Sequence, residues 1–442
     1  MVRLTRAQQQ ARTRASVLVA ARTEFTEHGY TDAKIDRIAE RADLTRGAVY
    51  SNFPSKRALY LAVLVDSLDD DATEPTENGT AAWTAGTTEA ETAEAGTGGA
   101  GATRNAEAGT GTAGAIRGET TAAGPGGKTG TVGSGPVGGG TAGRAGARTV
   151  GGGTAGGVGA VGGRASEGLG GALGAFARVW LERLPLSGDT PAGGELRLRS
   201  TAGLFDDERG RAALAQVTWL EALLLGLALE SHAPHVRRVR LAELVLTLLN
   251  GSGHLAGAAP GFGDPFDVAR ACRHLAVLDL ADSFDPPHLP FAVPATSVRE
   301  AWDPPAALPD EVTGRPAAFD GDGVIAVLGT GRLRAAEEAV RAARPGDRVT
   351  VAVVTADPAE VGRLVRLRIG DLARCLRRAF APDAWPDLRL VLDERAAVAA
   401  AAGVAEPGDD TEVAVRVRAG EIVARADGRG AAHSVAADET GV

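Results

Sequence analysis

Residues 44–53 read Leu44-Thr45-Arg46-Gly47-Ala48-Val49-Tyr50-Ser51-Asn52-Phe53, and this stretch decides the fold of the N-terminal region. Thr45 suits a helix N-cap because its hydroxyl can accept a hydrogen bond from a free backbone amide. Val49 and Phe53 recur at a spacing of four, which places them on one helix face. The stretch therefore predicts a short helix over 46–52 with one buried face and one exposed polar face.

Three more helices are predicted around this one. Apolar positions three and four apart indicate a first helix over 5–27, which Gly29 ends in left-handed geometry. A second helix over 32–42, with Thr31 or Asp32 as its cap, is followed by a tight turn. A fourth helix opens at Lys56, behind Pro54. Four helices in this order predict a small bundle that contains a helix-turn-helix unit.

A helix-turn-helix of this kind is suited to DNA, because a helix fits the major groove and its first amides can bind a phosphate. Residues 1–65 carry eleven basic and six acidic side chains, although the whole chain has a net charge of −9. This basic end favours a polyanionic partner. We predict contacts with double-stranded DNA from the residues at the helix starts and on the outer face of the third helix: Lys34, Thr45, Arg46, Gly47, Tyr50, Ser51, Asn52 and Lys56.

These residues carry a resemblance to a known family. The run Ile35-x-x-Ile38-Ala39, then Leu44-Thr45-Arg46-Gly47-Ala48-Val49-Tyr50-x-x-Phe53-x-x-Lys56, resembles the DNA-binding domain of the TetR family of transcriptional repressors. Two positions depart from the family pattern. Asp43 stands where the turn usually has glycine, and Lys34 stands where the second helix usually opens with threonine.

The resemblance implies a homodimer that binds a pseudo-palindromic operator and is released by a small-molecule effector of unknown identity. It also implies an all-helical effector and dimerisation domain, which we place at 171–284. Amphipathic segments over 171–184, 211–230, 236–251 and 266–282 fit such a domain. Its histidines, His232, His235 and His254, are interpreted either as pocket residues or as helix-end caps or surface residues.

A low-complexity segment separates the two helical regions. Residues 71–170 hold 31 Gly, 21 Ala and 18 Thr but only eight Val, Ile, Leu, Phe or Trp. So little apolar surface cannot offset an ordering cost of about 1–2 kcal/mol per residue. We predict a disordered linker over 69–170, looped out between helices that still contact each other.

The C-terminal part has a different pattern. A proline-rich linker is predicted over 285–316. Beyond it, residues 317–442 alternate between strand and helix and end in a hairpin turned at 418–420. This order resembles the thioredoxin-like fold, on segments such as Leu390-Val-Leu-Asp-Glu-Arg395 and Thr411-Glu-Val-Ala-Val415. The paired cysteines of that family are absent, because residues 329–334 read Gly-Thr-Gly-Arg-Leu-Arg, and its proline is replaced by Asp410.

Three roles are open for this region. One is redox chemistry, for which the chain offers only Cys272 and Cys375. Another is nucleotide binding at Gly329-Thr330-Gly331, although the third glycine of that motif is missing. The third is a docking module, for which removal of residues 317–442 would leave DNA binding intact. We predict no catalytic residue, no metal and no cofactor.

The overall prediction is a multidomain chain. It comprises a TetR-like helix-turn-helix domain over 1–68, the linker over 69–170, the helical domain over 171–284, the second linker over 285–316 and a thioredoxin-like α/β domain over 317–442. The longest helical apolar stretch, 222–229, is too short to span a bilayer, and residues 1–14 contain no apolar leader. A cytoplasmic regulator without a membrane partner is expected.

Overall fold

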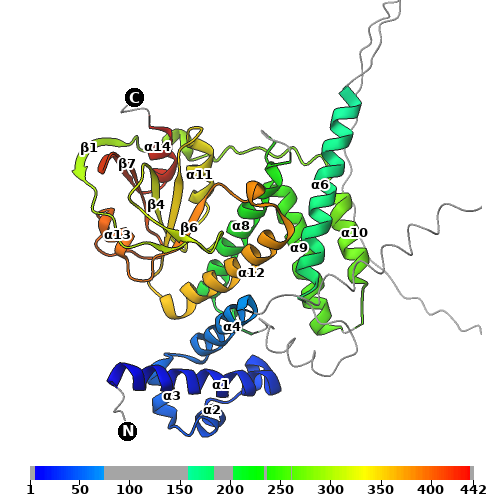
Figure 1. The fold of residues 1–442 in the computed structure, drawn as a ribbon, viewed down its shortest axis with the longest axis vertical. Coiled ribbons are helices and arrows are strands. Elements are labelled where there is room, and N and C mark those ends of the chain that lie inside the picture. Colours follow the sequence, from blue (N-terminus) through cyan, green and yellow to red (C-terminus); the bar gives the residue numbers. More distant parts are fainter. Residues whose placement is uncertain (1–4, 74–157, 184–202, 233–235, 260, 439–442) are drawn as a thin grey trace, which may run out of the picture. The chain divides into compact units, whose positions relative to one another are not determined.

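Four helices form the N-terminal region of the computed structural model, which describes residues 5–73, 158–183, 203–232, 236–259 and 261–438. They are α1 (Arg6–Asp32), α2 (Ile35–Arg41), α3 (Arg46–Asn52) and α4 (Lys56–Thr73), coloured blue in Figure 1. Gly29 interrupts α1 with a φ of 67°, and Asp43 takes a φ of 55° in the turn before α3. The conformation of Gly29 is the predicted one. Aspartate tolerates left-handed backbone better than most residues, so Asp43 can stand in the turn where the family usually has glycine.

The start of the second helix differs from the prediction. The N-cap of α2 is Lys34, whose side chain makes no capping bond, so the expected cap by Thr31 or Asp32 is wrong. A carboxylate from α1 takes that role: Glu24 Oε1 accepts the Lys34 backbone amide at 3.1 Å. Glu24 is completely buried, so this cap is also a tertiary contact between α1 and α2.

The long linker predicted over 69–170 lies mostly outside the described residues. At its two ends the structure is helical instead, because α4 runs on to Thr73 and α6 (Val158–Leu181) begins well before residue 170. Each is anchored by buried apolar residues, and extending an existing helix costs far less than starting one.

Four helices lie near the predicted segments in the described residues of the middle region. They are α6, α8 (Glu208–Glu230), α9 (Val239–Ala258) and α10 (Pro265–Leu275). Helix α8 is long and apolar enough to pass a length-and-hydropathy test for a membrane span, with a mean hydropathy of 1.7 over its best window. However, 61% of that window is buried inside the protein, as is typical of a core helix.

The C-terminal part is built on a six-stranded mixed sheet in the order β1-β8-β7-β4-β5-β6. Strands β4 (Gly323–Gly329), β5 (Val349–Val354) and β6 (Arg389–Leu392) run parallel, and β7 (Glu412–Arg418) and β8 (Glu421–Asp427) form the predicted hairpin. Ala419 and Gly420, both with positive φ, turn that hairpin. The sheet is drawn with its helices in Figure 1.

One strand of this sheet lies where the sequence predicted a linker. Strand β1 (Thr296–Ala301) pairs antiparallel with β8 at the sheet edge, so the expectation of an extended linker over 285–316 is wrong for these residues. The short pair β2 (Leu308–Pro309) and β3 (Pro316–Ala317) follows it. Prolines are compatible with edge and flanking positions, where a missing N–H breaks no central ladder bond.

Two apolar clusters sandwich the sheet. Alternate side chains of β4 point to opposite faces: Val324 and Leu328 join one cluster, and Ile325 and Val327 join the other. The first cluster contains helices α11 (Ala335–Ala342), α12 (Arg363–Ala379) and α14 (Ala431–Ala437), and it continues without a break into α6, α8, α9 and α10. The second contains α13 (Ala397–Ala401). The middle helices and the sheet therefore share one core.

Candidate nucleic-acid interface

Helix α3 has the two faces that its sequence predicts. The Thr45 hydroxyl accepts the Ala48 amide at 3.2 Å and caps the helix. Val49 and Phe53 are 1% and 0% exposed, whereas Arg46, Gly47, Tyr50 and Ser51 lie on the surface. The structure thus gathers these predicted DNA contacts on one exposed face; their contact with DNA stays a prediction.

Gly47 has no side chain, so the α3 backbone is uncovered at this point of the exposed face. A Cβ built there would meet Thr45 Oγ1 at 3.9 Å and no other heavy atom of the described chain within 4 Å. Packing within the protein does not call for a glycine at this position. A missing side chain is useful where backbone must approach a ligand closely, which is what a major-groove helix does.

The polar side chains of α3 are held by neighbours. Arg46 lies 3.3 Å from the Asp36 carboxylate of α2, and its guanidinium stacks 5.6 Å from the Tyr50 ring centre. Ser51 and Asn52 both donate to the Ala48 carbonyl at 2.9 Å. Because exposed ion pairs of this kind contribute at most about 1 kcal/mol, Arg46 can exchange Asp36 for a base or phosphate at low cost.

The two lysines predicted to contact DNA differ in exposure. Lys34 is exposed at the start of α2. Lys56 is partly buried: its ammonium donates to the Thr31 carbonyl at 3.0 Å and lies 5.1 Å from the Tyr30 ring centre. Burial lowers the pKa of Lys56. The Lys56 ammonium thus ties α4 to the end of α1, and its contact with a DNA phosphate stays a prediction.

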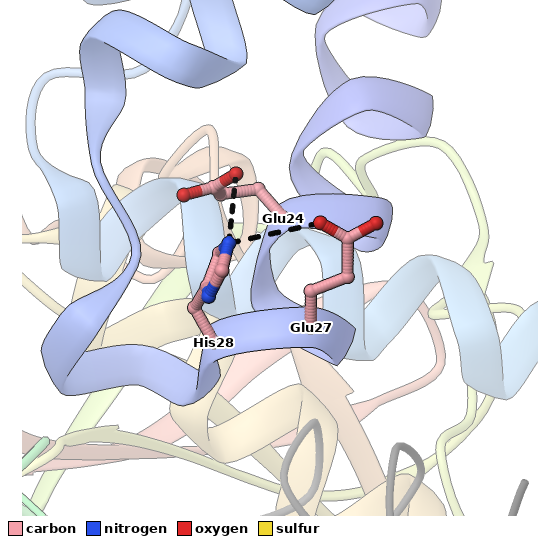
Figure 2. Close-up of side chains that lie close together, drawn as sticks. All are labelled: Glu24, Glu27 and His28. Atoms are coloured by element: carbon pink, nitrogen blue, oxygen red, sulfur yellow. Dashed lines mark ion pairs between the residues drawn. The ribbon is translucent and has the colours of Figure 1, made fainter.

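Glu24, Glu27 and His28 lie close together on α1, and Figure 2 shows the His28 ring facing both carboxylates. Their ligand atoms fall within 4.8 Å of one another, which is a spacing that a metal ion could use. The group already holds cationic partners, however. Arg37 and Arg41 lie 3.6 and 3.5 Å from the Glu24 carboxylate, and Arg41 also pairs with Glu27. We therefore interpret the cluster as a network of ion pairs that holds α2 against α1.

The glycine motif after β4 has a structural explanation. A Cβ on Gly329 would lie 2.3 Å from the carbonyl oxygens of Gly408 and Asp409, so only glycine fits this chain crossing. The amides of Gly329, Thr330 and Gly331 donate to carbonyls of Thr411, Val354 and Asp409 at 2.7, 3.2 and 2.7 Å. A phosphate cradle needs such amides unpaired. This geometry speaks against the nucleotide-binding alternative.

The thiols do not support the redox alternative. Cys272 and Cys375 are both buried and unpaired with each other. Burial raises the pKa of Cys272 to about 12 and also raises that of Cys375. Reactive cysteines need a stabilised thiolate and access, and these two residues lack both.

The Asp409 carboxylate occupies the loop cluster at the carboxyl ends of β4 and β5. It accepts hydrogen bonds from Thr330 (3.0 Å), Thr355 (2.7 Å), the Ala356 amide (3.1 Å) and Arg209 (2.8 Å). Partial burial alone would raise the pKa of Asp409, but these bonds outweigh it and hold the pKa below its usual range.

This lowered pKa gives a testable pH dependence. A carboxyl group whose folded pKa is depressed stabilises the fold above its unfolded pKa of about 3.9, and the contribution is lost as the pH falls through the folded value. Asp409→Asn is expected to lower the free energy of unfolding at pH 7 by about 1–3 kcal/mol. It should also flatten the loss of stability between about pH 5 and pH 3. Urea unfolding at several pH values measures both, and parallel pH profiles for the variant and the wild type would contradict the assignment.

An open cavity of about 530 Å³ lies between α6, the end of α8 and the end of α12. Small residues of α6 form one wall, and His232 and Phe380 form part of another, with their ring centres 6.1 Å apart. Of the three histidines singled out by sequence, His232 therefore lines a cavity. His254 is exposed on α9, and His235 lies outside the described residues.

Sequence reasoning missed one contact close to α3. The side chain of Glu360, which follows β5, bonds to Ser55 and Arg57 at the start of α4. Local sequence carries no signal for this contact, because more than 300 residues separate the partners. An acidic residue facing a basic one is too common a pair to be recognised from sequence alone.

The N-terminal helices match known regulators. Residues 17–63 match the family model of bacterial regulatory proteins, tetR family. The HTH-type transcriptional activator FasR of Mycolicibacterium smegmatis is 42% identical over 57 residues, which are 13% of this chain and 26% of FasR. The HTH-type transcriptional repressors AcnR of Corynebacterium efficiens and Corynebacterium glutamicum are each 36% identical over 66 residues, 15% of this chain and 35% of AcnR.

The likeness is confined to this region. The matches span about a quarter to a third of the length of these relatives. No solved structure matches the chain. Together, the capped recognition helix, the turn at Asp43 and the family match lead to one identification: residues 17–63 are a helix-turn-helix DNA-binding domain of the tetR family.

Proposed function

We propose that this chain is a transcriptional regulator that binds double-stranded DNA through α2 and α3. The observation that carries the proposal is the outer side of α3, where Arg46, Tyr50 and Ser51 lie exposed above a core closed by Val49 and Phe53. A helix presented in this way fits the major groove, and its capped first turn can bind a phosphate. The tetR-type match over the same residues supports it.

The regulator acts as a homodimer on a pseudo-palindromic operator. Two copies of α3 related by a two-fold axis would enter successive major grooves about 34–36 Å apart. We propose repression as its action, on the family resemblance. The relatives include both an activator and repressors by name, so a reporter-gene assay must decide between repression and activation of transcription.

A small-molecule effector of unknown identity releases the operator in this proposal. The cavity beside His232 is the candidate site for it, because α6 and the end of α8, both predicted as parts of the effector domain, line it together with the end of α12. We also propose the domain limits given by the sequence, except that α6 joins the helical domain from Val158 and strand β1 joins the α/β domain. The protein is proposed to be cytoplasmic and to need no cofactor. The burial of most of α8 supports placing that helix in a protein core.

For residues 317–442 we propose a thioredoxin-like fold without active-site cysteines. The parallel pair of β4 and β5, joined by α11 and completed by the antiparallel hairpin β7–β8, supports this assignment. The buried thiols favour a regulatory role over redox chemistry.

The test is a binding assay with genomic fragments at several salt concentrations. Wild-type protein should select a pseudo-palindromic site, with an affinity that falls as salt rises. Arg46→Ala is expected to raise the operator Kd by about tenfold, since a base or phosphate contact of arginine contributes about 1–3 kcal/mol.

Arg299→Ala is the matched control. Arg299 is 86% exposed on edge strand β1 and should leave the Kd unchanged. Wild-type protein that shows no sequence preference would rule out the proposed function, and equal effects of the two substitutions would remove Arg46 from the interface.

A further inference from the structure

We infer that the C-terminal α/β region controls the DNA-binding helices directly, through a junction between the start of α4 and the turn that precedes α12. This junction consists of Ser55 and Arg57 on one side and residues 358–367 on the other. The inference rests on the proposed function and adds the route by which regulation reaches α3. It also assigns the α/β region an active role in place of a passive docking module.

The polar half of the junction centres on Glu360. One of its carboxylate oxygens accepts the Ser55 hydroxyl, and the other accepts the Arg57 guanidinium. The Glu360 side chain is only 14% exposed, so water screens these bonds weakly. Arg57 also pairs with Asp207, just before α8, and thereby joins three regions of the chain at one point.

The apolar half lies beside it. Val361, Leu364 and Leu367 are buried in the same cluster as the core of the four N-terminal helices. Further along, the Arg374 guanidinium donates to the Leu68 carbonyl. Helix α12 thus follows α4 for several turns, as a structural part of the DNA-binding domain's own core.

The junction is close to the recognition helix in both sequence and space. Phe53 is the C-cap of α3 and is fully buried. The Arg363 guanidinium lies 5.7 Å from the centre of its ring and donates to the Ala58 carbonyl at 2.8 Å. A movement of the α12 start therefore acts on the residue that ends α3.

On the other side, the junction connects to the loops at the carboxyl ends of β4 and β5. Arg209 bridges Asp409 at 2.8 Å and Asp357 at 3.6 Å. Asp357 in turn caps the turn 358–362 by accepting the Glu360 amide at 3.0 Å. Ligands of α/β sheets bind at such carboxyl ends, so an event at this edge reaches α4 through the Arg209 ion pairs, the Asp357 cap and the Glu360–Arg57 pair.

The turn itself is suited to a change of state. Residues Pro358–Gly362 form one turn of π-helix before α12 begins. Such turns are rare, hold their backbone bonds in a wider register and concentrate at functional sites. A shift from this register to the α-helical one would rotate Glu360 relative to Arg57.

The experiment compares operator binding by three full-length variants. Glu360→Gln keeps the shape of the side chain and removes its charge, and Leu364→Ala removes apolar contact with the DNA-binding core. Glu421→Gln, at the exposed start of β8, is the control for Glu360→Gln. Hydrogen exchange of amides 45–60 is measured on the same proteins without DNA, after thermal melts have verified that each is folded.

We expect Glu360→Gln or Leu364→Ala, or both, to loosen α3 and so to speed hydrogen exchange at amides 45–60. The same variant should raise the operator Kd at least threefold, because a loosened α3 must be ordered on binding. Both variants keeping the Kd within threefold of wild type would overturn the inference while leaving DNA binding in place. If wild-type protein binds no operator, the proposed function fails. The junction is then tested by hydrogen exchange alone. Exchange rates of Glu360→Gln and Leu364→Ala equal to those of Glu421→Gln would overturn the inference.

Discussion

Removing residues 317–442 is expected to unfold the helices that precede them, and DNA binding is expected to be lost with them. The side chains of Val365, Ile369, Leu372 and Leu376 on α12 are buried in one cluster with α6 and α8. Burying such a side chain contributes about 1.5–3 kcal/mol each. Their sum is comparable with the whole net stability of a domain, about 5–15 kcal/mol. The shortened chain should aggregate and lose its cooperative thermal transition in circular dichroism.

A complementation control separates loss of contacts from poor expression. Residues 1–316 and 317–442, produced together as two chains, should associate and recover part of the helical signal, because the shared core is non-covalent. A shortened chain that stays soluble, melts cooperatively and binds the operator would contradict this prediction and restore the docking-module hypothesis.

The second large effect is expected at Glu24. Glu24→Ala should lower the free energy of unfolding by about 1–3 kcal/mol, because it removes a fully buried acceptor and leaves its amide and arginine partners without that carboxylate. Those partners are Arg37, Arg41 and the Lys34 amide. Since α2 depends on this carboxylate for its cap, operator binding should fall as the N-terminal helices lose their arrangement. Chemical denaturation followed by circular dichroism measures the loss.

Glu27→Ala is the matched comparison for Glu24→Ala. Its carboxylate is 45% exposed, so the change should cost no more than about 1 kcal/mol. The same pair tests the ion-pair interpretation of the cluster in Figure 2. Neither Zn²⁺ nor a chelator should alter the melting temperature of the wild type. A rise with Zn²⁺ that vanishes in Glu27→Ala would establish a metal site instead.

Features that depend on near neighbours could be predicted from the sequence. The cap at Thr45, the left-handed Asp43 and the exposed face of α3 follow from side chains within a few residues of each other. The strands β4 and β5 were predictable for a similar reason, because continuous β-branched runs mark strands buried on both faces. The helical core of the middle region was visible in its periodicity.

Features that depend on distant partners could not be predicted. Strand β1 reads as a linker because its partner, β8, lies more than 100 residues later. The sequence did not predict helix α14. The buried Arg416 of β7 holds the end of this helix by donating to the carbonyls of Val435 and Ala436. The burial of Glu24 and the contact of Glu360 with Arg57 are of the same kind. Charge type and spacing do not reveal which opposite charge a side chain will meet.

The distance along the chain between the two sides of the junction affects how this protein is made. Ser55 and Glu360 are 305 residues apart. At a synthesis rate of about 5–20 residues per second, Glu360 leaves the ribosome roughly 15–60 s after Ser55. During that interval the nascent chain has all four N-terminal helices and no α12 to cover them. Emergence of α12 therefore determines when the apolar surface of the N-terminal helices is covered, and a chain terminated before α12 exposes surface that chaperones and proteases recognise.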